Sequence, residues 1–198
     1  LLVFFIYISN LIFVYSLIIL GVLSIIEFLV ITNKIVKKKI FSYILNIIFV
    51  IYIYFFCFIF LFFYSQPQLK FIIFSLLSCC VFSDIGGFIF GKLFKGPKLT
   101  KISPNKTIAG SLGSLFLSCF SLAIIFYIIS IDLSLKLILI AAFTSIACQI
   151  GDLFFSYLKR KANIKDTGNF LPGHGGILDR IDGILLGIPL GILLIINL

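Results

Sequence analysis

The segment 156–182 gathers most of the reactive side chains of a chain that is otherwise largely hydrocarbon. It holds the only histidine, five basic residues and three carboxylates within 27 positions. Carboxylate oxygens bind Mg²⁺, usually together with a phosphate, and Lys and Arg neutralise phosphate oxygens. Asp179 and Asp182 are three positions apart, so on a helix they share a face. The segment therefore predicts a site for a phosphate compound held with a metal ion.

Two further aspartates, Asp84 and Asp152, lie inside apolar runs rather than beside them. A carboxylate deep in a membrane span costs roughly 2.5 to 3.5 kcal/mol on insertion scales, so both should line a polar cavity. Pairing with a lysine between helices is the alternative. Asp84 opens a glycine-rich segment, where backbone can approach a ligand closely, and Asp152 lies two helical turns before Lys159 and Arg160.

Three other positions allow more than one interpretation. Lys106 and Thr107 come just before a predicted helix, where backbone N–H groups and the helix dipole favour an anion, although lysine-rich loops also simply mark topology. His174, in a glycine-rich loop, suits a general acid or base, a nucleotide contact or a loop hydrogen bond. Glu27, two turns before Lys34, suits a structural ion pair or a packing role more than direct catalysis.

The composition indicates an integral membrane protein. Hydrophobic residues make up 62% of the chain and charged residues 12%, far from the balance of a soluble domain. The predicted fold is all-α: a polytopic helix bundle with six full transmembrane helices and a partial N-terminal one. The six predicted spans are 11–32, 41–64, 71–91, 108–131, 137–158 and 183–198. Residues 1–8 are interpreted as the tail of a helix, with a signal peptide as the alternative.

The basic residues predict the orientation. All of the 16 Lys and Arg residues except Lys70 and Lys136 fall in three alternate connections, 33–39, 92–106 and 159–182. Basic loops stay cytoplasmic, so these connections and the predicted site should face the cytoplasm. Asp132 falls in a predicted outer turn. We divide the chain into N-terminal transmembrane helices, 1–82, and a catalytic transmembrane region, 83–198, within one bundle.

Residues 156–182 closely resemble the signature of the CDP-diacylglycerol synthases, also called phosphatidate cytidylyltransferases. Two further blocks agree, an Asp-and-glycine block at 83–94 and an S-P-x-K-T-like block at 101–107, so the resemblance is close over about 83–183. The signature positions that match are Ser156, Lys159, Arg160, Lys165, Asp166, Gly168, Pro172, His174, Gly175, Gly176, Asp179, Arg180 and Asp182.

The resemblance implies a CTP-dependent nucleotidyltransferase that converts CTP and phosphatidic acid to CDP-diacylglycerol and pyrophosphate for phospholipid biosynthesis. It implies Mg²⁺ as cofactor and a bacterial-type inner membrane as the location. The implied catalytic carboxylates are Asp84, Asp152, Asp179 and Asp182, with Asp152 and Asp179 as metal ligands. The implied contacts to CTP or lipid phosphates are Lys106, Lys159, Arg160 and Arg180, with Ser156 and His174 in the nucleotide-binding loop region.

The chain departs from the family pattern at a few positions. Phe155 stands where Glu is common, Ile108 and Ala109 where an aromatic precedes Glu or Gln, Ser114 where Gly is common, and Gly183 where Ser is frequent. Most of these changes remove polar groups near the predicted site, which predicts some effect on activity. The central aspartates are retained.

Several other functions fit the sequence less well than this one. An ion-coupled transporter also buries aspartates and interrupts helices with glycine, but it would place its acids near the midplane. A CDP-alcohol phosphotransferase would need a clustered aspartate pattern that this sequence lacks, and a structural anchor does not explain residues 172–182. The net charge of +9 does not indicate nucleic-acid binding, because the lysines sit between apolar runs. A homodimer is left open.

Overall fold

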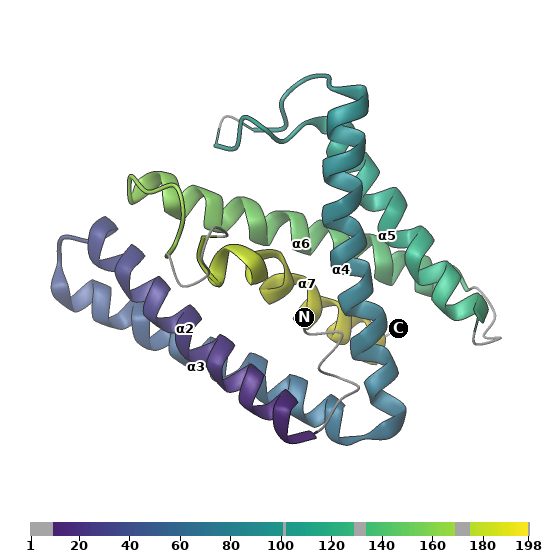
Figure 1. The fold of residues 1–198 in the computed structure, drawn as a ribbon, viewed down its shortest axis with the longest axis horizontal. Helices are drawn as coiled ribbons and strands as arrows, with labels where there is room; N and C mark the ends of the chain where they lie inside the picture. The colour runs from purple at the N-terminus through teal and green to yellow at the C-terminus, as the bar shows by residue number, and fades with distance from the viewer. Residues whose placement is uncertain (1–9, 101, 129–133, 169–174, 198) are drawn as a thin grey trace. The chain divides into compact units, whose positions relative to one another are not determined.

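The computed structural model describes residues 10–100, 102–128, 134–168 and 175–197. Every regular element within those ranges is a helix, which confirms the predicted all-α class (Figure 1). The helices are α2 (Asn10–Ile35), α3 (Lys39–Ser65), α4 (Pro67–Phe94), α5 (Ile108–Ile128), α6 (Leu135–Lys161) and α7 (Leu178–Asn197).

Five of these helices, α2 to α6, are long and apolar enough to cross a membrane, so the chain is an integral membrane protein. Each contains most or all of one predicted span. The predicted count of six full spans plus a partial one is not confirmed. The helix α7 is not among the five. The predicted partial helix at residues 1–8 lies outside the described residues.

The chain divides into two compact units. Unit 1 comprises Leu1–Lys70 and Phe155–Ile181, and unit 2 comprises Phe71–Phe154 and Asp182–Leu198. The helices α6 and α7 each contribute residues to both units. Our division at residues 82 and 83 was drawn by function, and it stays a prediction.

Unit 1 is built on α2 and α3, which lie side by side and are joined by residues 36–38 (Figure 1). The Thr32 hydroxyl donates to Asn46 Oδ1 at 2.6 Å, so a buried polar pair links the two helices. The Phe28 and Phe49 rings stack with centroids 3.8 Å apart, and the Phe155 ring meets Phe49 edge-on at 6.4 Å. Phe155, where the family commonly has Glu, is therefore a buried packing residue in this chain.

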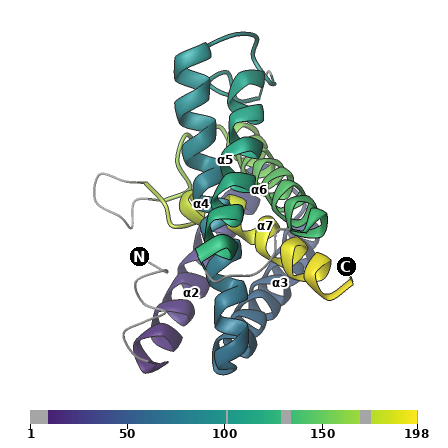
Figure 2. The ribbon, with the colours of Figure 1, turned by 90° about the vertical axis from the view of Figure 1, so that its right-hand side faces the viewer.

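Unit 2 depends on glycines where helices approach closely. The helices α4 and α5 lie side by side (Figures 1 and 2), and a Cβ atom at Gly86 would be 2.4 Å from the Gly113 carbonyl oxygen. Between α6 and α7, a Cβ at Gly151 would be 2.5 Å from the Asp182 carbonyl oxygen. In a membrane no hydrophobic effect drives helices together, so their association depends on close packing, which small residues allow. Such packing positions the helix segments that carry Asp84, Asp152 and Asp182.

We predict that Gly113→Ala destabilises unit 2. The new Cβ would lie 2.3 Å from Phe90 Cβ, so the helices must separate, and overpacking of this kind typically costs about 1 to 3 kcal/mol. The midpoint of thermal unfolding in detergent should fall. Leu112→Ala is the matched control because the Leu112 side chain is 62% exposed on the same helix, and it should change the midpoint little. Equal midpoints for the two variants would contradict this packing.

Candidate active site

Asp179 is held at the start of α7 by three donors within unit 1. The Lys159 ammonium donates to Asp179 Oδ1 at 2.7 Å. The backbone N–H groups of Thr167 and Gly176 donate to Oδ2 at 2.9 and 3.1 Å. The two charged side chains are only 14% and 11% exposed, so this is a largely desolvated ion pair. The signature segment thus brings together two of the residues that the sequence predicted for the site, and it fixes the orientation of Asp179.

Two opposing effects set the pKa of Asp179. Burial raises the pKa, but the Lys159 ammonium and the Thr167 and Gly176 N–H groups outweigh it, and the pKa lies below its ordinary value of 3.8. A carboxyl group whose pKa is lower in the folded state stabilises that state at every pH above its unfolded pKa. This contribution is lost as the pH falls through the lower folded pKa.

We therefore predict a pH-dependent effect of Asp179→Asn. At pH 7 the variant should unfold at a lower temperature than the unaltered chain, because it loses the charge that pairs with Lys159. The difference should shrink as the pH falls from about 3.8 towards the lower folded pKa, because the unfolded chain binds a proton at Asp179 before the folded chain does. Thermal unfolding in detergent between pH 7 and pH 3 tests this, and a constant difference down to pH 3 would contradict it.

Glu27 is the residue of this region whose role the sequence did not reveal. Its carboxylate, only 1% exposed, accepts hydrogen bonds from the Thr167 hydroxyl at 2.6 Å and from the backbone N–H groups of Ile177 and Leu178 at 2.8 Å each. Glu27 therefore has a structural role, as expected, but its partners are residues of the signature segment and not the predicted Lys34. The only sequence signal was an acid inside an apolar run, 150 positions before Ile177.

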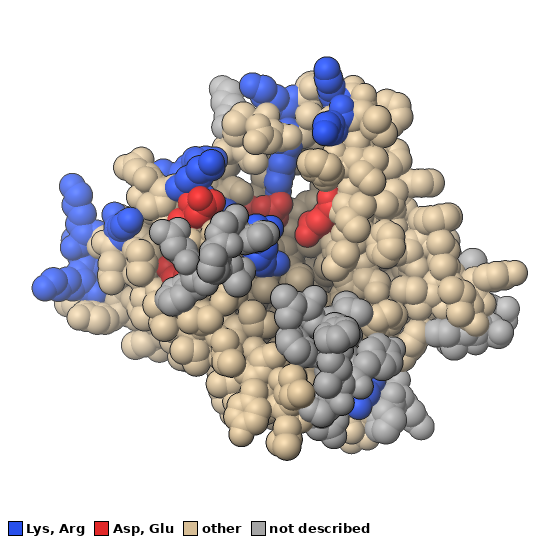
Figure 3. All heavy atoms as spheres, in the orientation of Figure 1, with Lys and Arg blue, Asp and Glu red and all other residues tan. Residues whose placement is uncertain are grey.

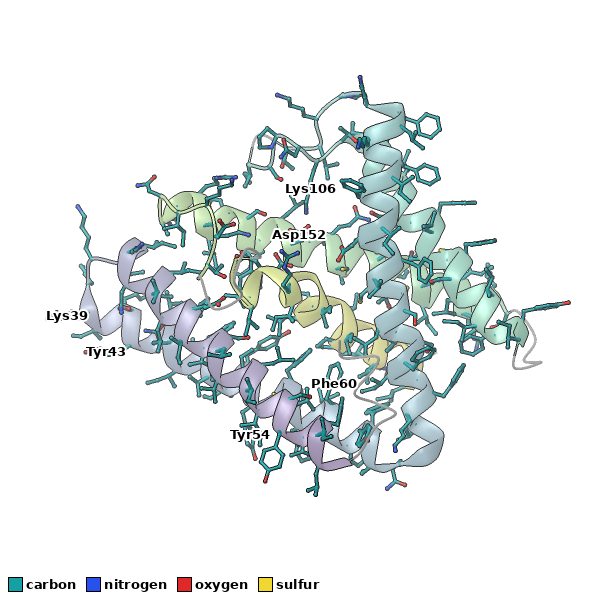
Figure 4. The ribbon with its side chains drawn as sticks, viewed as in Figure 1. Lys39, Tyr43, Tyr54, Phe60, Lys106 and Asp152 are labelled. Carbon is teal, nitrogen blue, oxygen red and sulfur yellow. The ribbon has the colours of Figure 1, made fainter. Side chains whose placement is uncertain are left out.

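In unit 2, Lys106 forms an ion pair with Asp152. Figure 4 shows Lys106 reaching from the connection before α5 towards Asp152 on α6, and its ammonium contacts Asp152 Oδ2. Asp84 on α4 interacts electrostatically with both residues, and the Cys148 thiol lies 3.9 Å from its Oδ1. Three predicted site residues from three different segments of unit 2 therefore form one charged group, with two carboxylates and one ammonium.

The connection that carries Lys106 is itself pinned by hydrogen bonds. The Leu99 N–H donates to the Lys106 carbonyl oxygen at 2.7 Å, and the Thr107 hydroxyl caps α5 by accepting from the Gly110 N–H at 3.1 Å. The Ile108 N–H donates to the Pro97 carbonyl oxygen at 3.1 Å. Two N–H groups at the start of α5 are thus already bonded within the protein. A phosphate contact at this position would depend on the Lys106 side chain more than on the helix N-terminus.

The lysines of this connection give unit 2 a concentrated positive charge. Figure 3 shows Lys and Arg side chains gathered over the connection between α4 and α5, at the top of the view. The exposed lysines described in this region are Lys92, Lys95 and Lys98, whereas Lys106 is half-buried. Anionic compounds should therefore be attracted to this end of unit 2.

The other predicted site residues have varied surroundings. Asp182 is buried and accepts from the Gly183 N–H at 2.9 Å. Ser156 is half-buried on α6, and Arg160 and Arg180 are exposed. His174 lies outside the described residues, so its role stays a prediction. The predicted residues thus include both buried anchors and exposed cations.

The carboxylates differ in how well they fit a divalent cation. Within the described ranges, no group of three or more His, Cys, Asp or Glu side chains could by itself hold a metal ion. Mg²⁺, however, is commonly bound by one or two carboxylates, water and substrate phosphates, which the pair Asp84 and Asp152 can satisfy. Asp179 already accepts three hydrogen bonds, and a carboxylate offers about four lone-pair sites, so one direction remains.

Two departures from the family pattern are explained by local packing. A Cβ at Gly183, where the family often has Ser, would lie 2.5 Å from the Cys148 sulfur and 3.1 Å from the Cys148 carbonyl oxygen, so a larger residue would force Cys148 to move. Ser114, where the family has Gly, is buried, and its hydroxyl oxygen lies 2.8 Å from the Cβ position of Gly87. Both changes are accommodated by a small partner on the facing helix.

The comparisons with known proteins agree with the signature. The model of the cytidylyltransferase family matches residues 1–197. A phosphatidate cytidylyltransferase of Staphylococcus aureus is 32% identical over 176 residues, covering 86% of this chain and 67% of that protein. Phosphatidate cytidylyltransferases of Staphylococcus haemolyticus and Rickettsia bellii are 39% and 41% identical, covering 66% and 65% of this chain.

The chain spans only part of the length of these relatives, 50% for the S. haemolyticus protein and 59% for the R. bellii protein. The family match nevertheless extends over nearly all of this chain. The ion-coupled transporter finds no support in these matches. The chain belongs to the cytidylyltransferase family, the family of the CDP-diacylglycerol synthases that its signature resembles.

Proposed function

We propose that the chain is a phosphatidate cytidylyltransferase, which transfers the cytidylyl group of CTP to phosphatidic acid. The observation that carries the proposal is the ion pair between two signature residues, Lys159 and Asp179, at 2.7 Å, in a chain that the family model matches over residues 1–197. The Lys106 and Asp152 pair of unit 2 provides a second charged group of the same kind. Relatives bearing that enzyme name support the assignment.

In the proposed reaction, a phosphate oxygen of phosphatidic acid attacks the α-phosphorus of CTP. The bond from the α-phosphorus to the bridging oxygen breaks, and pyrophosphate leaves. Because the attacking phosphate is already an anion near pH 7, no strong general base is required. The main task of the protein is then to orient two anionic reactants and to neutralise charge as it develops.

The charged residues can supply that neutralisation. Lys106 in unit 2 and Lys159, Arg160 and Arg180 in unit 1 bind phosphate oxygens of CTP or of the lipid. Ser156 and His174 belong to the segment that binds the nucleotide. Asp84 and Asp152 would hold Mg²⁺ in unit 2. Asp179 in unit 1 keeps one direction free for a cation, and Asp182 remains a proposed catalytic carboxylate of unit 2. When bound, the ion would withdraw charge from the phosphate oxygens.

The distribution of lysines supports a site that opens to the cytoplasm, and the bacterial relatives support the cytoplasmic membrane of a bacterial-type cell as its location. This orientation matches the reactants, since CTP is a soluble nucleotide and phosphatidic acid a membrane lipid. The chain would thus bind one reactant from water and one from the bilayer. Attachment of a thiol-specific, membrane-impermeant reagent to a cysteine introduced at the exposed Lys98 would test which side this connection faces.

The function is tested with membranes containing the full chain, labelled CTP, phosphatidic acid and Mg²⁺. We expect label in the lipid fraction that depends on phosphatidic acid, together with release of pyrophosphate. No lipid label, under conditions in which the S. aureus relative produces it, would contradict the proposal. Accumulation of a solute inside vesicles without lipid labelling would indicate the transporter instead.

A further inference from the structure

We propose that Glu27 on α2 is a positioning residue that sets the backbone of the signature segment and, through it, the orientation of Asp179. The inference rests on the proposed function, because it gives the purpose of that orientation. Glu27 lies in the N-terminal part of the chain, outside the signature. Its carboxylate nevertheless makes its three hydrogen bonds to signature residues on both sides of 169–174.

The first support is the chemistry of the contacts. The Ile177 and Leu178 N–H groups belong to the start of α7, where helical amides have no partner within the helix. A carboxylate suits that position because it accepts both hydrogen bonds and interacts favourably with the helix dipole. The third donor, the Thr167 hydroxyl, lies on the other side of 169–174. Glu27 therefore links Thr167 to the start of α7 through hydrogen bonds to both.

The second support is the shape of the space around the carboxylate. A Cβ at Gly168 would be 2.7 Å from Glu27 Oε1, and a Cβ at Gly176 would be 2.5 Å from Oε2. Real Cβ atoms do not approach oxygen so closely, so both positions require glycine while Glu27 is in place. The position of the Glu27 carboxylate thus explains why two signature positions, 168 and 176, are glycine.

The third support is the link from Glu27 to Asp179. Thr167 donates its hydroxyl to Glu27 at 2.6 Å and its backbone N–H to Asp179 at 2.9 Å. Gly176 lies against Glu27 and donates its N–H to Asp179 at 3.1 Å. Loss of the Glu27 contacts would therefore displace two of the three groups that hold Asp179. Glu27 acts on the reaction through these groups rather than by touching a substrate.

The test compares Glu27→Gln with Phe49→Leu, both in purified full chain assayed well below the unfolding midpoint. Gln keeps the size of the side chain but replaces one acceptor by an N–H donor, which faces donors already present. We expect CDP-diacylglycerol formation per folded molecule to fall about 10-fold or more, because small misplacements of reacting groups are costly. Phe49 stacks on Phe28 and meets Phe155 edge-on, but it takes no part in the hydrogen bonds that link Glu27 to Asp179, so Phe49→Leu should lower stability but retain activity.

A double-mutant cycle with Thr167→Val separates positioning from general destabilisation. If Glu27 acts through Thr167, the activity losses of Glu27→Gln and Thr167→Val should be far from additive. Thr167→Val also serves if Glu27→Gln does not fold, since it removes only one hydroxyl, and it should then lower activity several-fold on its own. Activity losses that match those of Phe49→Leu, or that simply add, would overturn the inference. An inactive unaltered chain would instead overturn the proposed function.

Discussion

Asp152→Asn should reduce CDP-diacylglycerol formation by about 100-fold or more. Removal of one group that stabilises developing charge in a preorganised site typically costs a factor of 10² to 10³. The change also leaves Lys106 without its ion-pair partner and removes one of the two carboxylates of unit 2 that are proposed to bind Mg²⁺. The rate of label transfer from CTP to lipid should therefore fall, and half-maximal activity should require more Mg²⁺ than in the unaltered chain.

Two companion variants make the result specific. Asp84→Asn should raise the Mg²⁺ requirement in the same direction, because Asp84 interacts with both Asp152 and Lys106. Asp132→Asn is the control, since the sequence predicts a solvated outer turn for Asp132, and it should leave activity unchanged. Full activity in both Asp152→Asn and Asp84→Asn would exclude the proposed metal ligands and leave the family assignment in place.

Lys159→Met should cause a loss of similar size, about 100-fold, for two separable reasons. It removes a cation proposed to bind phosphate, and it leaves the mostly buried Asp179 carboxylate without its partner. Activity and thermal unfolding should be measured on the same preparation, because the second effect lowers stability as well as rate. Lys161→Met is the matched control: Lys161 is exposed, and its ammonium lies 5.9 Å from the centre of the Tyr157 ring.

The double variant Lys159→Met with Asp179→Asn distinguishes the two reasons. If Lys159 serves only to hold Asp179, the double variant should be no less active than the worse single variant. If Lys159 also binds a phosphate, the losses should be larger together and the KM for CTP should rise. Near-normal activity in Lys159→Met would contradict both roles.

The sequence predicted the helices well because membrane spans are local features. Long apolar runs bounded by lysines or short polar turns indicate a helix directly, and α2 to α6 match the predicted runs. The final helix is the exception. Its first turn carries Asp179, and α7 begins at Leu178, five positions before the apolar run. The start of α7 depends on hydrogen bonds to residues distant in the sequence, such as Glu27, and the pattern of apolar residues cannot predict these.

The sequence singled out charged residues that form ion pairs in the structure, but it did not give most of the pairings. Lys159 and Asp179 lie 20 positions apart in one signature segment, so an ion pair between them is easily formed. Lys106 and Asp152 are 46 positions apart, and Glu27 is 150 positions from Ile177. From the sequence alone, any of several lysines could have paired with Asp152 or Glu27. Only the packed helices select which donor reaches which carboxylate.

The close approach of Gly183 to the Cys148 sulfur couples substitutions at the two positions. Replacing Gly183 by serine would place a Cβ atom 2.5 Å from that sulfur, so the Cys148 side chain would have to move or be replaced by a smaller one. A deviation from a family pattern can thus have its reason in the residue that faces it. Variants of this chain designed towards the family consensus should alter such contacting positions together, one pair at a time.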